Sequence, residues 1–319
     1  MVNAIFNMTL VTEQPMSITL PVAEGTRANR FENSPIMTRG VDDEGKGEQT
    51  CYIPATTFRG MLRRQAVIPK MEKRQKSGNP YMLSEAYADL IGQDPGSEQQ
   101  ANEINLVALK KQREENPVID LFGLGLGIQS RLKVSHFLPE KNILPEVFTT
   151  ARKDLGDHEE GKLLDLLHPD ELSTYHKRST ANSNKSRAET LLRSLSAKKK
   201  KDGSSKELDA QIKETEKKIK EYTDQMGGME NSSRAIFGFY AMPQGVEWSG
   251  RLVVTNYKER DMEMICSALD RFSQYPMLGA QHARGCGEIS GRAEVKIDGL
   301  LVKQISFGGF DAAKIDEFA

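Results

Sequence analysis

The stretch Tyr52-Ile-Pro-Ala-Thr-Thr-Phe-Arg-Gly-Met-Leu-Arg-Arg64 has the pattern of a strand end, a tight turn and the start of a helix. Pro54 ends the strand, and either Thr56 or Thr57 is expected to cap the helix. Gly60 would let the first helical turn lie close to a neighbouring backbone. This stretch therefore predicts a strand-to-helix junction on which the rest of the fold is arranged.

Two faces are predicted for this helix, which is expected to run to about Ala66. Phe58, Leu62 and Ala66 fall on one apolar stripe, while Arg59 and Arg63, four residues apart, share another face. A helix N-terminus with arginines beside it suits a phosphate. An ordinary amphipathic helix with solvated arginines fits the same residues, so the neighbouring motifs decide between the two interpretations.

The composition indicates a globular protein with a polar excess. The chain has 319 residues, of which 38% are hydrophobic and 28% are charged. No apolar run approaches the roughly 20 residues of a membrane span, and residues 1–11 alternate instead of forming a signal pattern. Cys51, Cys266 and Cys286 are too far apart to suggest a disulfide framework or a zinc site. We expect a cytoplasmic protein without a metal, a cofactor or a membrane partner.

Strand patterns occur in both halves of the chain. Alternation predicts strands at Val2–Val11, Ser130–Leu138, Ser233–Tyr240, Trp248–Asn256 and Ala293–Ile297, and helical spacing predicts a helix over Met262–Phe272. Gly123, Gly125 and Gly127 are expected to permit close backbone approach, since their spacing is wrong for a nucleotide-binding turn. The order of these elements fits an α+β fold with a ferredoxin-like antiparallel sheet and large excursions.

The strand Ser130–Leu138 is expected to place Arg131 and Lys133 on one face of the sheet, where two cations can follow a nucleic-acid backbone. The opposite face would carry Leu132, Val134, His136 and Leu138. Exposed strands also carry such cations for solubility alone.

Positive charge is concentrated in one segment. Residues 177–220 contain 14 Lys/Arg and 6 Asp/Glu, although the net charge of the whole chain is −1. Helical stretches are predicted at Glu159–Leu167, Ser186–Leu195 and Leu208–Tyr222, with a mobile tip at Lys198–Lys201. The segment either meets a polyanion or forms a lysine-rich solvated helix.

Three pieces of the chain, taken in order, resemble the repeat-associated (RAMP) superfamily of CRISPR proteins. They are Ile53-Pro-Ala-Thr-Thr-Phe-Arg-Gly-Met-Leu-Arg, then Leu121-Phe-Gly with Ser130-Arg-Leu-Lys-Val, and finally Gly279-Ala-Gln-His-Ala-Arg-Gly-Cys-Gly287. Within the superfamily the chain looks most like the backbone subunit, the CRISPR-associated protein seven family. The long helical insertion, which carries no nuclease motif, is most similar to that of the type IV backbone subunit.

The resemblance implies an RRM-like palm with fingers and a thumb. On this reading residues 1–138 are the first half of the palm, with a finger-like loop at 24–50 and a helical excursion at 67–118. Residues 139–232 are a helical, lysine-rich thumb or web, and residues 233–319 are the second half of the palm. The implied partners are CRISPR RNA, a complementary target nucleic acid (DNA or RNA), further copies of the chain and other effector subunits.

The guide-RNA contacts implied by the resemblance are cations, glycines and one histidine. They are Arg27, Arg30, Arg59, Gly60, Arg63, Arg131, Lys133, His282, Arg284, Gly285 and Gly287. Asn33 and Ser34 would lie near the guide–target duplex. Contacts to the phosphate backbone would leave the guide bases free to pair with any target.

One position departs from the RNA-cleaving type III relatives. The resemblance places a catalytic aspartate directly before a Ser-Pro-hydrophobic step, but here Asn33 precedes Ser34-Pro35-Ile36. Asparagine cannot take up a proton or hold a divalent cation as an aspartate does. We therefore expect a non-catalytic protein, the alternative being a metal-dependent endoribonuclease that uses Asp42 or Asp43.

Two further alternatives stay open. A guide-processing ribonuclease could use His282 or His136 as its general base, although neither has an evident acid partner. The chain could also be a small RNA-binding module whose polar helical insertion serves protein contacts.

Overall fold

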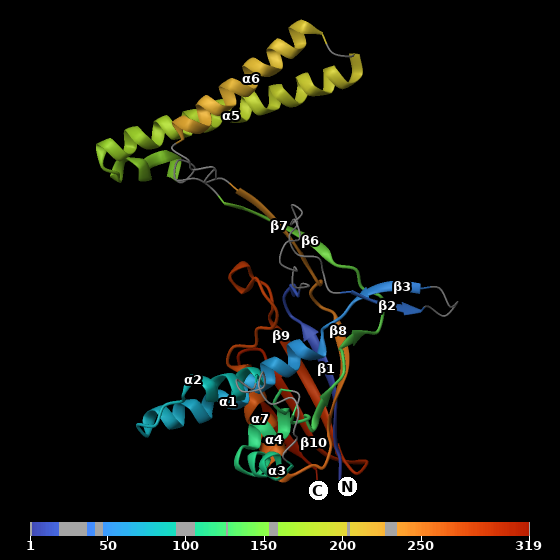
Figure 1. Cartoon of the computed structure of the whole chain (residues 1–319). Coiled ribbons are helices and arrows are strands. Elements are labelled where there is room, and N and C mark those ends of the chain that lie inside the picture. The colour runs from blue at the N-terminus through green and yellow to red at the C-terminus, as the bar shows by residue number, and fades with distance from the viewer. Residues whose placement is uncertain are drawn as a thin grey trace. The chain divides into compact units, whose positions relative to one another are not determined.

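The computed structural model describes residues 2–18, 37–41, 47–93, 106–125, 127–152, 159–202, 205–226 and 235–318 (Figure 1). The chain divides into two units. Residues 1–148 and 239–319 form the first, here called the sheet unit, and residues 149–238 form the second, called the helical unit.

The sheet unit is built around β1 (Ala4–Thr12), in which buried and half-buried residues alternate strictly. β8 (Glu247–Val254) and β9 (Ile289–Ile297) pair antiparallel with β1 on its two sides. The strand order is β11-β10-β9-β1-β8-β4, and β5 also pairs with β8. The remaining bounds are β4 (Leu132–Val134), β5 (Leu138–Pro139), β10 (Leu300–Gly308) and β11 (Lys314–Glu317).

The order of β9, β1, β8 and β4 is that of a ferredoxin-like sheet, so the predicted fold class is confirmed. β10 and β11 extend the sheet beyond the predicted strands. The short β4 and β5 replace the single strand expected over Ser130–Leu138.

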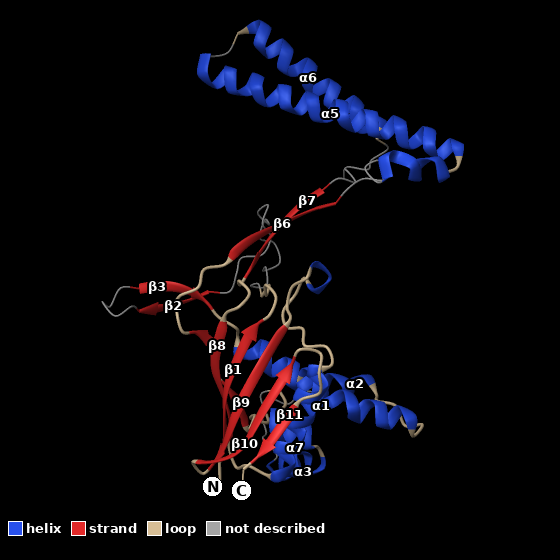
Figure 2. Ribbon diagram, turned by 180° about the vertical axis from the view of Figure 1, so that it is seen from behind, coloured by secondary structure: helices blue, strands red, loops and turns tan. Residues whose placement is uncertain are grey.

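Helices cover one face of the sheet and leave the other open. Figure 2 shows the open face, with α1 (Ala55–Lys76) and α7 (Glu259–Ser273) on the far side of the strands. The apolar side chains of β1, α1 and α7 share one core, which includes Phe6, Phe58 and Phe272. The smaller elements are α2 (Leu83–Ala86), a π-helix (Tyr87–Ile91), α3 (Leu106–Glu115), α4 (Pro117–Phe122) and the β2–β3 hairpin (Met37–Val41, Gly47–Cys51).

The strand-to-helix junction forms where it was predicted, but its details differ. The N-cap of α1 is Pro54 and neither Thr56 nor Thr57 caps the helix, so the expected threonine cap is wrong. Instead, the first backbone N–H, that of Ala55, donates to Nδ1 of His136 at 3.0 Å. The helix also continues past Pro69 to Lys76, ten residues beyond its expected end.

Gly123 lies where the backbone approaches itself closely, as predicted, whereas the same prediction for Gly127 is wrong, since a Cβ there would meet only a Leu109 side-chain atom at 3.8 Å. The φ of Gly123 is +77°, and a Cβ on Gly123 would lie 2.5 Å from the carbonyl oxygen of Ile128 and 2.7 Å from the nitrogen of Ser130. Only glycine fits this turn without moving the chain.

The helical unit contains two long helices. α5 (Pro169–Asp202) follows a 3₁₀ helix (Glu159–Leu166), and α6 (Lys206–Gln225) packs along it. The residues Lys198–Lys201, expected in a mobile tip, instead belong to the last turns of α5. β6 (Glu146–Arg152) and β7 (Ala235–Ala241) pair as a separate two-stranded sheet.

Candidate nucleic-acid interface

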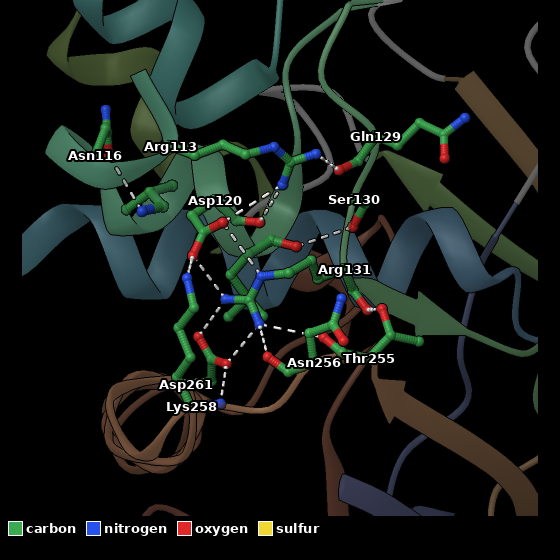
Figure 3. Close-up of polar contacts among 12 residues, drawn as sticks. Arg113, Asn116, Asp120, Gln129, Ser130, Arg131, Thr255, Asn256, Lys258 and Asp261 are labelled. Atoms are coloured by element: carbon green, nitrogen blue, oxygen red, sulfur yellow. Dashed lines mark hydrogen bonds and ion pairs between the residues drawn. The ribbon is translucent and has the colours of Figure 1, made fainter. Parts of the chain in front are cut away.

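Arg131 is buried in a network of ions and does not lie on a binding surface (Figure 3). Its Nη1 and Nη2 donate to both carboxylate oxygens of Asp261 at 2.8 and 2.7 Å. Nη2 and Nε also donate to Asp120, at 2.9 and 3.2 Å. Nη1 further contacts the carbonyl oxygen of Asn256 at 2.9 Å. Because these groups occupy the whole guanidinium, the prediction that Arg131 lies beside Lys133 on a phosphate-binding face is wrong.

Asp120 connects this network to neighbouring elements. It also accepts from Lys258 at 2.6 Å and from Arg260 at 2.7 Å. Burial alone would raise the pKa of Asp120, but hydrogen bonds from Lys258, Arg260 and Arg131 hold its pKa well below the ordinary value. Asp261 also accepts from the backbone N–H of Lys258 at 2.8 Å and so caps the start of α7. The network therefore joins α4, the approach to β4 and the start of α7.

The side chains of Arg59 and Arg63 in α1 also donate their hydrogen bonds to other parts of the protein. Arg63 is 4% exposed and donates to the carbonyl oxygens of Asp89 at 2.5 Å and Ala88 at 2.6 Å, in the π-helix. Burial, with Arg59 nearby, lowers the pKa of Arg63 to about 10. Arg59 is half-buried and donates to the carbonyl oxygen of Phe122. These contacts show that Arg63 anchors the π-helix. Because its guanidinium is buried and already hydrogen-bonded, the predicted phosphate contact of Arg63 is wrong.

Gly60 differs from these arginines because the fold does not require it. A Cβ at Gly60 would meet only the end of the Arg64 side chain, at an ordinary 3.6 Å. The expected close approach to a neighbouring backbone is therefore absent among the described residues. A glycine inside a helix costs about 1 kcal/mol of stability relative to alanine. No packing contact in the described part of the chain accounts for the glycine at this position.

The loop between α7 and β9 is held rigidly by its backbone. The N–H of Gly287 donates to Pro15 at 2.8 Å, and the N–H of Ala280 donates to Ser17 at 2.8 Å. A Cβ at Gly279 or at Gly287 would lie 2.6 Å from a carbonyl oxygen, so these two glycines serve packing. Gly287 is thus an internal residue of the loop and is not positioned for phosphate contact.

The outer part of this loop is a short 3₁₀ turn, His282–Arg284, which ends at Gly285. The Arg284 side chain is exposed, lies over the Phe239 ring at 5.9 Å and donates to Gln281 Oε1 at 2.5 Å. Gly285 has a φ of +74° and open space around its Cβ position. The fixed loop therefore presents a cation and an accessible backbone side by side.

The two histidines considered as general bases have different surroundings. His136 caps α1 through Nδ1, as described above. His282 is half-buried, with its ring edge-on to Tyr275 at 6.2 Å, and its Nε2 has no hydrogen-bond partner among the described residues. Within the described residues no group of three or more His, Cys, Asp or Glu side chains is arranged to hold a metal ion.

The open face of the sheet carries cations that the sequence analysis missed. Arg251 of β8 lies opposite Asn7, and Arg292 of β9 lies opposite Thr9, on the two sides of β1. Both line a hollow of about 880 Å³ whose lining residues include no Phe, Tyr or Trp. Exposed Lys133 lies on the adjoining β4. Alternation with buried Leu252 and Ala293, respectively, was the signal that could have identified the two arginines as outward-facing.

Six predicted residues lie outside the part of the chain that the structure describes. They are Arg27, Arg30, Asn33, Ser34, Asp42 and Asp43. None of the described helices is both long and apolar enough to cross a membrane.

Comparisons with known proteins identify a family and similar solved structures. The family model of the RAMP superfamily matches residues 33–290. A solved chain from a "Type IV-B CRISPR Complex" is similar, with 15% sequence identity and a TM-score of 0.46, over 91% of this chain and 90% of that chain. No curated protein matches the sequence.

Proposed function

Since this chain belongs to the RAMP superfamily, we propose that it is a non-catalytic, guide-RNA-binding backbone subunit of a CRISPR effector complex. Several copies would assemble along one guide and present it to a complementary target, together with other effector subunits. The division into a palm (1–138 and 233–319), a finger-like loop (24–50) and a thumb (139–232) belongs to the same proposal.

The observation that carries the proposal is the fixed loop with Arg284 and Gly285. Because the backbone of this loop is anchored to the segment after β1, the cation is held in place before any ligand arrives. A preorganised cation beside an exposed backbone suits a phosphate group. Holding the loop in place beforehand also lowers the cost of ordering it on binding.

Two further observations support contact with phosphates in preference to bases. The hollow on the open face is lined by no Phe, Tyr or Trp, so a base would find only the small ring of His136 to stack on. Lys133, Arg251 and Arg292 provide cations on that side of the sheet. A surface that contacts the phosphate backbone of the guide and leaves its bases uncovered suits a guide that must pair with a target.

The proposed guide contacts are therefore narrower than the predicted set. They are Arg284, Gly285, His282, Lys133 and Gly60, with Arg27 and Arg30 from the loop at 24–50. Gly60 joins them because its lack of a side chain would let a backbone lie against α1. Arg59 would contribute only its positive field, since its guanidinium donates to Phe122.

The test is to purify the chain from cells that carry a CRISPR array and to measure its mass and its bound RNA. We expect large assemblies containing array-derived RNA for the wild type. Arg284→Glu should lose most of that RNA, whereas Lys73→Glu, a charge reversal at an exposed position near the far end of α1, should keep it. A wild-type chain that purifies as an RNA-free monomer and ignores added array RNA would overturn the proposal.

The non-catalytic part of the proposal rests on Asn33 and has its own test. The loaded assembly is incubated with complementary RNA and Mg²⁺, and the RNA is examined on a sequencing gel. We expect intact target RNA. Cleavage at regular intervals, lost on replacing Asp42 or Asp43, would instead establish the endoribonuclease alternative.

A further inference from the structure

The helical unit contains a surface of one charge type that the proposed function does not use. α5 and α6 form a helical hairpin in which α5 alone, at 34 residues, is about 51 Å long (Figure 1). The seam between the helices includes Ala181 and Leu195 of α5 and Thr215 of α6, all buried. Lys199 of α5 also pairs with Asp209 of α6 at 2.6 Å.

The charges of the two helices follow different patterns. α6 has five lysines and six acidic residues, and they form pairs along the helix such as Lys218–Glu214 at 2.6 Å. Mixed charges with pairs four residues apart are typical of a helix that is simply solvated. Residues 172–201 of α5, in contrast, contain nine Lys/Arg and a single acidic residue, Glu189.

The cations of α5 gather on the side away from α6. Counting 100° per residue from the buried Ala181 and Leu195, nine exposed residues lie on the opposite side between Ser183 and Lys201, here called the basic face. They are Ser183, Ser186, Arg187, Thr190, Arg193, Ser194, Ala197, Lys200 and Lys201. Four are cations, the other five are small, and none is acidic or aromatic; the half-buried Glu189 borders this face.

This composition has physical consequences for what can bind. Short Ser, Thr and Ala side chains let the longer cations project past them. In the described part of the chain no carboxylate pairs with Arg187, Arg193 or Lys201, so their charge is not neutralised internally. The basic face spans about 27 Å at 1.5 Å per residue, and along that length a nucleic-acid duplex carries a phosphate about every 1.7 Å of its axis.

We propose that the basic face of α5 binds the phosphate backbone of a nucleic-acid duplex without reading its sequence. A duplex fits better than a single strand, because the face has no aromatic ring on which an exposed base could stack. The straight helix matches a stiff partner, and its cations contact the backbone in the manner that positions a protein on DNA without specifying bases. This binding does not depend on the guide-RNA contacts proposed for the sheet unit.

The test uses the full-length protein as purified, a fluorescent 20-base-pair DNA of arbitrary sequence and anisotropy at several salt concentrations. The variant is Arg187→Glu with Arg193→Glu and Lys201→Glu. The matched control, Lys213→Glu with Lys217→Glu and Lys220→Glu, makes the same charge change on exposed positions of α6. Circular dichroism of both variants must show wild-type helicity.

We expect the α5 variant to lose at least tenfold in duplex affinity at 100 mM salt, and the control to lose less than threefold. The slope of log K against log salt should fall in magnitude by roughly 2 to 3, since each lost phosphate contact accounts for about 0.9. The α5 variant should keep its array RNA. Loss of that RNA with unchanged duplex binding would overturn this inference while leaving RNA binding established.

Three other results would refute the inference. Equal losses in the two variants would show a general charge effect. Tighter binding of single-stranded DNA of the same length would show a different ligand. Unchanged duplex binding together with loss of another effector subunit from the α5 variant would identify the basic face as a protein contact.

Discussion

Replacing Arg131 by methionine tests whether this residue supports the fold or contacts RNA. The change removes the cation that two buried carboxylates share, those of Asp120 at 2% and Asp261 at 0% exposure. Asp120 keeps Lys258 and Arg260, whereas Asp261 keeps the N–H of Lys258 at 2.8 Å. Removing one partner of a buried ion pair costs about 3–5 kcal/mol, because a charge remains without compensation.

The expected shift in unfolding temperature follows from the size of the sheet unit. For a unit of about 230 residues, each kcal/mol corresponds to about 2–4 °C. Arg131→Met should therefore unfold about 6–20 °C below the wild type in a thermal scan followed by circular dichroism. Urea unfolding of both proteins at pH 7 gives the free-energy difference directly.

Lys133 supplies the control, two residues further along the chain. Its side chain is exposed on β4, so Lys133→Glu should change the free energy of unfolding by less than about 0.5 kcal/mol. Its RNA retention should nevertheless fall, whereas folded Arg131→Met should retain RNA in proportion to folded protein. An Arg131→Met protein that unfolds at the wild-type temperature but has lost its RNA would refute this reasoning.

Three further predictions concern the described residues. Asp120→Asn should destabilise the protein at pH 7, and the difference in urea unfolding should shrink below about pH 4; the folded pKa lies below the ordinary 3.8, so the stabilisation is full above that value and is lost as pH falls through the folded pKa. Gly123→Ala should cost about 1–3 kcal/mol through its positive φ and backbone clash, whereas Gly127→Ala, with its nearest atom at 3.8 Å, should cost less than 0.5 kcal/mol in the same urea assay. Burial raises the pKa of Cys51 to about 11 and also raises the pKa of Cys266 and Cys286, so mass spectrometry after iodoacetamide at pH 8 should find these thiols unlabelled in the native protein and labelled in urea.

Elements with a clear period were predictable from the sequence. β1 alternates over its whole length and α7 keeps helical spacing, so both appear within two or three residues of their expected bounds. β10 was missed because a register shift between Leu301 and Lys303 breaks its alternation. The length of α5 was also missed, since few of its residues are apolar and they give almost no apolar period.

The candidate site was less predictable than the fold, because the environment of a cation depends on residues far away in sequence. The partners of Arg131 lie 11 and 130 residues from it, and Arg63 is fixed by carbonyl groups 25 and 26 residues further along. None of these four separations corresponds to a local sequence pattern. The fold itself brings these groups together.

The basic face of α5 is the opposite case, because the surroundings of its cations depend on residues nearby in the sequence. Within a helix the neighbours of a side chain are three and four residues away, so local sequence determines most of its surroundings. Around Arg187 and Lys201 those positions hold no acid, and around Arg193 they hold one, the half-buried Glu189. The antiparallel α6 can supply carboxylates only along the seam, as Asp209 does for Lys199. A cation on the outer side of a long helix therefore keeps its charge available for an external polyanion. A cation next to a sheet core, in contrast, readily forms ion pairs and hydrogen bonds within the protein.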